Sequence, residues 1–245
     1  MSKVMIVTGG GRGIGAATAR LAAGRGYKVC INYVRNGDAA AKLVGELGKK
    51  AMAVQADVAS EADVLRMYKM VDEKLGRLTV LVNNAGIVDR SSRVEAMSAE
   101  RIQRMLAINV TGSFLCAREA VKRMSTRHGG KGGAIVNVSS MAAKLGGSGD
   151  YVDYAASKGA IDTLTVGLAR EVGAEGIRVN GVRPGVIRTE IHATSGDPAR
   201  AERIGAAAPL QRAGEAEEVA RTILWLASGE ASYITGALLD VSGGR

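Results

Sequence analysis

Aromatic residues are scarce in this chain of 245 residues, where they make up 3% of the sequence. Proteins that bind single-stranded nucleic acids stack bases on aromatic side chains, so this composition disfavours that class of function. Histidine is rarer still, since only His128 and His192 occur. Neither has a carboxylate partner at the spacing of metal ligands. We therefore expect no metal site and assign neither histidine to catalysis.

Cysteine and long apolar runs are also nearly absent. Cys30 and Cys116 lie far apart, and Cys30 falls in the apolar stretch 27–31, as a buried strand residue would. We expect no structural disulfide between them. The first apolar run, residues 4–7, is too short for a signal peptide or a membrane span and has the length of a strand. These absences indicate a cytoplasmic protein with no membrane segment.

The net charge of +9 arises from 33 basic and 24 acidic residues. The basic residues are scattered along expected helices and form no cluster, which favours a solvated basic surface over a nucleic-acid interface. A positive field of this kind would also attract a phosphorylated cofactor.

Short apolar runs alternate with longer amphipathic ones along the whole chain, which is typical of βαβ units. We expect strands near 3–8, 28–33, 51–56, 78–82, 133–138, 176–182 and 237–241. We expect helices near 13–25, 37–48, 60–75, 99–126, 153–173 and 215–228. This order predicts an α/β fold with a doubly wound, mainly parallel and Rossmann-like sheet of about seven strands, with helices on both faces.

The chain has only three prolines, no Pro/Ser-rich linker and no repeat of fixed period. Residues 1–245 are therefore expected to form one domain. The least regular stretch, 188–214, contains Pro198 and Pro209 and is interpreted as a short substrate lid.

A glycine-rich segment, Thr8-Gly9-Gly10-Gly11-Arg12-Gly13-Ile14-Gly15, separates the first expected strand from the first expected helix. Glycine permits a tight turn, a close approach of the backbone to a pyrophosphate, and close packing of helix on strand. The helix N-terminus then offers free N–H groups and a positive dipole end to the phosphates. The residues of this segment expected to bind a nucleotide are Gly9, Arg12, Gly13, Ile14 and Gly15.

The second expected strand ends in Asn32-Tyr33-Val34-Arg35, and no acidic residue follows before Asp38. A carboxylate at this place binds the free ribose hydroxyl of NAD and would repel the 2′-phosphate of NADP. Arg35, and with it Arg12, is expected to pair with that phosphate; the alternative is that both arginines are solvated surface charges. If NADH were preferred, Asn32 would be the ribose contact, and Tyr33 lies in the same stretch.

Asp57 and Val58 follow the third expected strand. The Asp57 carboxylate is placed either to accept a hydrogen bond from an adenine amino group or to cap the helix that starts near Ser60. The pattern does not separate these alternatives.

Four further segments occur in a fixed order: Asn83-Asn84-Ala85-Gly86, Asn109, Ser139-Ser140, and Tyr154-Ala155-Ala156-Ser157-Lys158. Together with the glycine-rich segment, they resemble the short-chain dehydrogenase/reductase family over essentially the whole chain. The resemblance implies an oxidoreductase that transfers a hydride between a nicotinamide and a carbonyl or secondary alcohol. It implies Asn109, Ser140, Tyr154 and Lys158 as catalytic residues.

Hydride transfer to a carbonyl leaves an alkoxide that needs a proton, and an unperturbed tyrosine with a pKa of about 10 exchanges protons poorly near neutrality. Tyr154 and Lys158 are four residues apart and share a helix face, whereas an isolated pair of this kind is usually an exposed one without a role. We expect Lys158 and the oxidised nicotinamide to lower the pKa of Tyr154. Both residues also contact the cofactor in the family.

Two serines compete for contact with the reacting oxygen. The family usually has this serine thirteen residues before the tyrosine, whereas Ser140 precedes Tyr154 by fourteen, so the loop between them has one additional residue. Ser140 is preferred and Ser139 is the alternative. Asn109 matches the asparagine that kinks its helix and holds a water molecule in a proton relay, or else it is a buried structural residue.

The resemblance also implies cofactor contacts in two other loops. Asn83, Ala85 and Gly86 lie beside the adenine ribose, or the turn only stabilises the sheet. In Arg183-Pro184-Gly185-Val186-Ile187-Arg188-Thr189, the backbone of Ile187 and the hydroxyl of Thr189 are expected to contact the nicotinamide carboxamide or the phosphates. The residues of this loop expected to bind the cofactor are Pro184, Gly185, Ile187 and Thr189.

The sequence thus predicts an NADP(H)-dependent oxidoreductase, with NADP(H) preferred over NAD(H), acting on a small carbonyl or alcohol substrate. A catalytically silent nucleotide-binding regulator is the alternative. The substrate stays open among 3-oxoacyl thioesters, sugars or polyols, and other ketones. The resemblance further implies a homotetramer, although Ser242 stands where many relatives have an acid.

Overall fold

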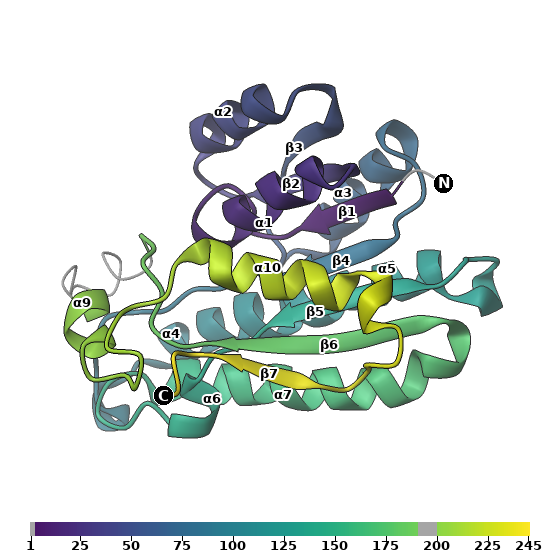
Figure 1. Ribbon diagram of the computed structural model, residues 1–245. Coiled ribbons are helices and arrows are strands. Elements are labelled where there is room, and N and C mark those ends of the chain that lie inside the picture. The colour runs from purple at the N-terminus through teal and green to yellow at the C-terminus, as the bar shows by residue number, and fades with distance from the viewer. Residues whose placement is uncertain (1–2, 191–199) are drawn as a thin grey trace.

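Seven parallel strands form one sheet at the centre of the molecule (Figure 1). The computed structural model describes residues 3–190 and 200–245. The strands are β1 (Lys3–Val7), β2 (Tyr27–Tyr33), β3 (Ala51–Gln55), β4 (Val80–Asn83), β5 (Gly133–Val138), β6 (Ile177–Pro184) and β7 (Leu238–Val241). The expected fold class and all seven strands are confirmed, and β6 extends two residues further than predicted.

The chain starts in the middle of the sheet and winds in both directions, because the strand order is β3-β2-β1-β4-β5-β6-β7. β1 pairs with β2 on one side and with β4 on the other, and Val7 lies opposite both Ile31 and Val82. The strand order therefore reverses between β1 and β4. In an open α/β sheet, the crevice beyond the carboxyl ends of the strands at such a reversal is where ligands bind.

Helices cover both faces of the sheet. The principal ones are α1 (Gly13–Gly24), α2 (Gly37–Leu47), α3 (Glu61–Lys74), α4 (Ala99–Leu106), α5 (Gly112–Met124), α7 (Val152–Val172) and α10 (Ala216–Ala227). Two short helices, α6 (Ala142–Leu145) and α9 (Arg200–Gly205), were not separately predicted. None of the described helices is long and apolar enough to cross a membrane.

Alternation along the strands divides the core into two layers, because successive side chains of a strand point to opposite faces of the sheet. In β1, Met5 and Val7 pack with α1, α2 and α10, while Val4 and Ile6 pack with α3, α5 and α7. Cys30 and Cys116 are both buried in the second layer as free thiols. Their expected lack of a disulfide is confirmed.

The helix expected over 99–126 is interrupted, which corrects the prediction. A π-helical turn, η3 (Ala107–Thr111), lies between α4 and α5. Asn109 is the buried residue of this turn, at the place where the family resemblance implied a kink.

The stretch 188–214 is described only in part, since residues 191–199, with His192 and Pro198, lie outside the described residues. Within the described part, α9 covers Arg200–Gly205 and an isolated bridge joins Ile187 to Gly214. The two ends of the stretch thus meet beside the carboxyl end of β6, and the substrate lid stays a prediction.

Candidate active site

The glycine-rich loop fits closely between β1, α1 and the segment after β4. Gly9 has φ +60° and Gly13 has φ +51°, conformations that other residues seldom adopt. A Cβ atom at Gly15 would lie 2.5 Å from the carbonyl oxygen of Gly9 and 2.7 Å from Nδ2 of Asn84. The loop therefore has no room for larger residues at these positions, as expected of a backbone that approaches a pyrophosphate closely.

The side chains of Asn32 and Asn84 hold this loop by hydrogen bonds to its backbone. Asn32 is buried, its Oδ1 accepts a hydrogen bond from the Gly9 amide at 3.2 Å, and its Nδ2 donates to the carbonyl of Ala56 at 2.8 Å. Asn84 donates to the carbonyl oxygens of Thr8 and Gly9 at 2.8 Å and 3.0 Å. The structure thus uses Asn32 to fix the loop, and a ribose contact of this residue, expected only if NADH were preferred, stays a prediction.

The first turn of helix α1 has features that favour the binding of an anion. Arg12 precedes it in an extended conformation without capping the helix through its side chain, and no acidic residue lies in the first turn. The first N–H groups of the helix are therefore not neutralised by the helix's own side chains. Ile14 and Gly15 lie in this turn, and Gly15 is buried.

The end of β2 lacks any carboxylate that would exclude a 2′-phosphate. Tyr33 is half-buried, and Gly37 packs on its ring. Asn36 caps α2 by accepting a hydrogen bond from the Ala39 amide. Arg12 and Arg35 are exposed, and among the residues that the structure describes neither forms an ion pair. Neither arginine is therefore neutralised by a carboxylate within the described residues.

Asp57 does not cap α3, because Ser60 does so by accepting a hydrogen bond from the Asp63 amide. This removes the capping alternative for Asp57. Its carboxylate accepts a hydrogen bond from the Ala59 amide at 2.9 Å, which forms a local turn. Val58 is buried against Gly112, where a Cβ atom would lie 2.7 Å from the valine side chain.

Ser140, Tyr154 and Lys158 come together beyond the end of β5. Ser140 is hydrogen-bonded to the Tyr154 side chain, and the Lys158 ammonium lies 5.7 Å from the centroid of the Tyr154 ring. Lys158 is buried and donates to the Val138 carbonyl at 2.7 Å. Ser139 is buried and donates instead to the Lys158 backbone carbonyl at 3.2 Å. The geometry therefore favours Ser140 over Ser139.

Burial shifts the pKa values of the tyrosine and the lysine toward their neutral forms. It raises the pKa of Tyr154 to about 12, against a smaller lowering effect of the Ser140 hydrogen bond. It lowers the pKa of Lys158 to about 8, against a smaller raising effect of the Asp162 carboxylate. The expected lowering of the Tyr154 pKa concerned Lys158 together with the oxidised nicotinamide and stays a prediction, while in the protein alone burial raises this pKa.

Asn109 connects the π turn to the catalytic helix. Its Oδ1 accepts from the Ile87 amide at 2.8 Å, and its Nδ2 donates to Ser157 Oγ at 3.0 Å. Gly86 separates Asn109 from Lys158, since a Cβ atom there would lie 3.3 Å from Asn109 Oδ1 and 3.5 Å from Lys158 Nζ. Asn109 therefore belongs to the same cluster as the tyrosine and the lysine.

In the segment after β4, one residue stabilises the sheet and others contact the glycine-rich loop. Asn83 is buried and donates to the Ser113 carbonyl and to Asn137, so it shapes the sheet. Ala85 is half-buried, and its amide donates to Thr8 Oγ1 at 3.0 Å. The prediction named Asn83 for the cofactor side and missed Thr8 and Asn84, whose polar contacts fix the loop. The adjacent Asn-Asn pair was the available signal, and only the sheet register shows which member faces the loop.

The loop after β6 closes over the start of α1. Pro184 is buried, Gly185 packs on Ser242, and Ile187 is buried. A Cβ atom at Gly13 would lie 3.1 Å from the Thr189 methyl group. Thr189 thus faces the glycine-rich loop, as the prediction of a phosphate or carboxamide contact requires.

Comparisons with known proteins identify the family of this chain. A family model described as Enoyl-(Acyl carrier protein) reductase matches residues 9–245. The chain is 56% identical over 245 residues to the Uncharacterized oxidoreductase YgfF of Escherichia coli, with 99% of each chain covered. The chain belongs to the short-chain dehydrogenase/reductase family. A second relative of this family, a 3-oxoacyl-[acyl-carrier-protein] reductase of Synechocystis, is 40% identical over 247 residues, which are 99% of this chain and 96% of that protein.

Solved structures of the family superpose closely on this chain. A 3-ketoacyl-(acyl-carrier-protein) reductase from Brucella melitensis complexed with NADH has a TM-score of 0.93 at 33% identity, over 99% of this chain and 98% of that one. A blue fluorescent protein from a metagenomic library in complex with NADPH has a TM-score of 0.89 at 37% identity, over 99% and 97%. The chain is therefore an oxidoreductase of this family, and these two solved relatives hold a nicotinamide cofactor.

Proposed function

We propose that this protein is an NADP(H)-dependent oxidoreductase that reduces a carbonyl group to a secondary alcohol, or catalyses the reverse reaction, with Tyr154 as general acid and base. One observation carries the proposal. Ser140, Tyr154 and Lys158 lie together beyond the end of β5, and burial raises the pKa of the Tyr154 phenol against the lowering effect of its hydrogen bond to Ser140. This is the arrangement that a carbonyl oxygen needs as it gains negative charge.

The protein's own groups divide the work at the carbonyl oxygen. The bound cofactor supplies or accepts the hydride. Ser140 donates a hydrogen bond to the developing oxyanion, and Tyr154 gives it a proton. Lys158, held by the Val138 carbonyl, places a positive charge near the phenol so that the tyrosinate left behind is stabilised. Asn109, through Ser157, fixes the turn of α7 that contains the tyrosine.

The features that support NADP(H) are the crowded glycine loop, the uncapped start of α1, and the two arginines beside it. No carboxylate stands at the end of β2 to bind a ribose hydroxyl and repel a phosphate. The cofactor residues proposed from this geometry are Gly9, Arg12, Gly13, Ile14, Gly15, Tyr33, Arg35, Asp57, Val58, Ala85, Gly86, Tyr154, Lys158, Pro184, Gly185, Ile187 and Thr189. The buried free thiols are compatible with the reducing cytoplasm, where we place the protein.

The first substrates to test are 3-oxoacyl thioesters, because several relatives bear the name 3-oxoacyl-[acyl-carrier-protein] reductase. The 56% identical relative is named only as an uncharacterised oxidoreductase, which gives no substrate class. Sugars or polyols and simple ketones complete the panel.

The test is the loss of NADPH absorbance with each substrate class, using the wild-type protein and Tyr154→Phe. We expect turnover with at least one class, and a loss of more than tenfold, about 1.4 kcal/mol or more, in Tyr154→Phe, because the substitution removes only the ionisable hydroxyl. NADPH binding, followed by fluorescence, should be nearly unchanged in the variant. Binding without turnover across the panel would favour a catalytically silent regulator instead.

A further inference from the structure

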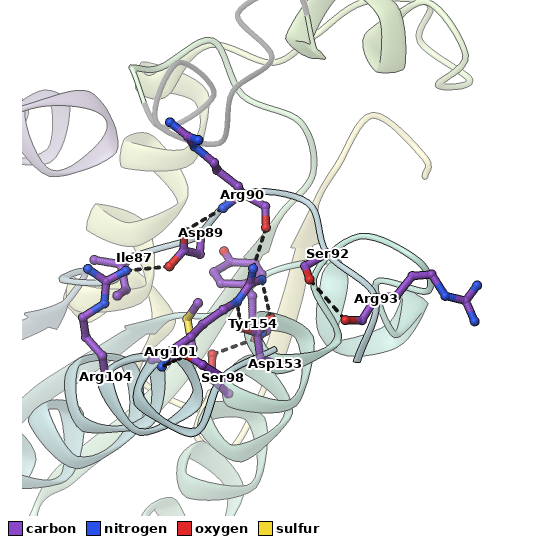
Figure 2. A network of polar contacts seen from close by, with 12 residues as sticks. Ile87, Asp89, Arg90, Ser92, Arg93, Ser98, Arg101, Arg104, Asp153 and Tyr154 are labelled. Carbon is purple, nitrogen blue, oxygen red and sulfur yellow. Dashed lines mark hydrogen bonds and ion pairs between the residues drawn. The ribbon is translucent and has the colours of Figure 1, made fainter. Parts of the chain in front are cut away.

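A partly buried ion pair joins α4 to the first turn of the catalytic helix α7 (Figure 2). Arg101 Nε lies 2.7 Å from Asp153 Oδ2, and Arg101 Nη2 lies 3.2 Å from Asp153 Oδ1. The Arg101 side chain is 13% exposed and the Asp153 side chain 3%. The two parallel contacts form a forked arrangement, which fixes orientation as well as distance. Asp153 immediately precedes Tyr154 in the chain.

The carboxylate of Asp153 also holds the backbone of the tyrosine. Its Oδ1 accepts a hydrogen bond from the Tyr154 amide at 2.9 Å. Tyr151 stands at the N-cap position of α7 and provides no side-chain cap, so the first turn of the helix relies on Asp153 for an acceptor. A negative charge in this turn is also favourable toward the positive end of the helix dipole.

The backbone carbonyl of Tyr154 is also held by a hydrogen bond, through a residue that contacts the π turn after α4. Ser157 Oγ donates to the Tyr154 carbonyl at 2.7 Å and accepts from Asn109 Nδ2 at 3.0 Å. Asn109 lies in the π turn that continues α4. Both polar groups of the Tyr154 backbone are therefore connected, through Asp153 and through Ser157, to the continuous segment of α4 and η3.

Arg101 extends this connection to the loop after β4. Its Nη1 donates to the Arg90 carbonyl at 2.8 Å. The next cationic residue of α4, Arg104, is exposed and pairs with Asp89 of the same loop, and within residues 3–190 and 200–245 it forms no ion pair with α7. Arg101 is thus the side chain at which α4, α7 and the loop 89–93 meet (Figure 2).

Stability alone does not account for an ion pair in this place. Removing two charges from water costs free energy that their attraction only partly repays, and apolar replacements of such pairs are often equally stable. The fixed geometry of the fork is what an apolar pair could not provide. That geometry fixes the backbone amide of Tyr154, the residue whose hydroxyl must contact the substrate oxygen.

From these contacts we infer that Arg101 and Asp153 are positioning residues for Tyr154. Asp153 binds the Tyr154 amide, and Arg101 holds Asp153 in place against α4 and the loop after β4. The inference rests on the proposed function, because it concerns the geometry of that same catalytic tyrosine. Misplacement of a reacting group by about 1 Å can cost about 100-fold in rate.

The experiment compares four proteins: wild type, Arg101→Met, the double variant Arg101→Met with Asp153→Leu, and Arg104→Met. The rate of hydride transfer is measured in single turnovers and expressed per NADPH site, with binding stoichiometry and melting temperature recorded for each protein. We expect Arg101→Met to slow the step by about 10- to 100-fold while NADPH affinity changes less than about twofold. Arg104→Met, its matched control on the same helix, should keep the wild-type rate.

The double variant separates positioning from stability. An apolar Met–Leu pair should restore much of any lost melting temperature, because it leaves no buried charge unpaired. It cannot bind the Tyr154 amide, so we expect the rate to remain low. Recovery of the rate together with the melting temperature would overturn the inference, as would a wild-type rate in Arg101→Met.

A spectroscopic readout keeps the inference testable without turnover. The titration of Tyr154 is isolated as the ultraviolet difference between each protein and its Tyr154→Phe counterpart, with NADP⁺ bound. A displaced phenol has changed contacts with Ser140 and Lys158. We therefore expect the midpoint pH of the Tyr154 titration to shift in Arg101→Met and in the double variant, but not in Arg104→Met. An inactive wild type would refute the proposed function alone, and an unmoved transition would refute the inference.

Discussion

Ser139 and Ser140 are neighbours in the chain, yet they face different partners. Ser139 is buried and donates a hydrogen bond to the Lys158 backbone carbonyl, while Ser140 is hydrogen-bonded to the Tyr154 side chain. We predict that Ser140→Ala lowers kcat by about 100-fold, because one donor to the developing oxyanion is lost. Steady-state kinetics of Ser139→Ala provide the control, with a much smaller loss expected. The reverse ranking would move the oxygen contact to Ser139.

The pH dependence of carbonyl reduction should report the charge on Lys158. Burial lowers the pKa of this ammonium to about 8, and the protonated form is the one that stabilises a tyrosinate. The active form is therefore complete well below pH 8 and is lost as the pH rises through that value. We expect kcat/KM for reduction to be level from about pH 6 to pH 7 and to fall about tenfold per unit well above pH 8. A level profile up to about pH 10 would show that this charge is not needed.

The proposed preference for NADP(H) rests on Arg12 and Arg35. We predict that NADPH binds about 10- to 100-fold more tightly than NADH, since charge-assisted contacts to the 2′-phosphate contribute about 1–3 kcal/mol. Arg35→Ala should remove most of this preference and Arg12→Ala a smaller share. Titration by cofactor fluorescence measures both. Equal affinities in the wild type would return the two arginines to the role of surface charges.

At the scale of elements, the start of α1 depends on contact distances that only glycine allows. We predict that Gly15→Ala weakens NADPH binding by more than tenfold, because the new methyl group would lie 2.5 Å from the Gly9 carbonyl oxygen and displace the loop. Gly45→Ala is the matched control, since that glycine lies in α2 with no atom within 4 Å of its added Cβ. Fluorescence titration of both variants checks the prediction. Normal binding by Gly15→Ala would mean that the loop tolerates the shift.

Helix periodicity located the segment 99–126 but did not find the break within it. Both halves are amphipathic, and the sequence around Asn109 contains no proline to interrupt them. The π turn instead occurs where Asn109 reaches Ile87 and Ser157, two partners distant in sequence. Contacts of this range are set by the packing of α4 against α7, so propensity along one helix cannot reveal them.

At the scale of the whole molecule, exposed apolar side chains support the proposed assembly. Leu106 and Phe114, on either side of the π turn, are 41% and 51% exposed. We predict a tetramer by light scattering at micromolar concentration, and a smaller species for Phe114→Asp, because a charge would disfavour burial of that face. Leu65→Asp on α3, at 43% exposure, is the matched control. A monomeric wild type would contradict the prediction.

The sequence by itself determined the sheet, the glycine-rich loop and the residue types of the catalytic cluster. These depend on local periodicity and on glycine, which act within a few residues. Only the tertiary structure decided the rest. It shows that Ser140, and not Ser139, is hydrogen-bonded to the Tyr154 side chain, and that Asn32 holds the glycine-rich loop through the Gly9 amide. It also shows that burial raises the pKa of Tyr154 in the protein alone. It also brought Arg101 to Asp153 across 52 residues of chain. The reason is physical, because burial, desolvation and forked ion pairs depend on which elements pack together, and one strand or helix does not carry that information.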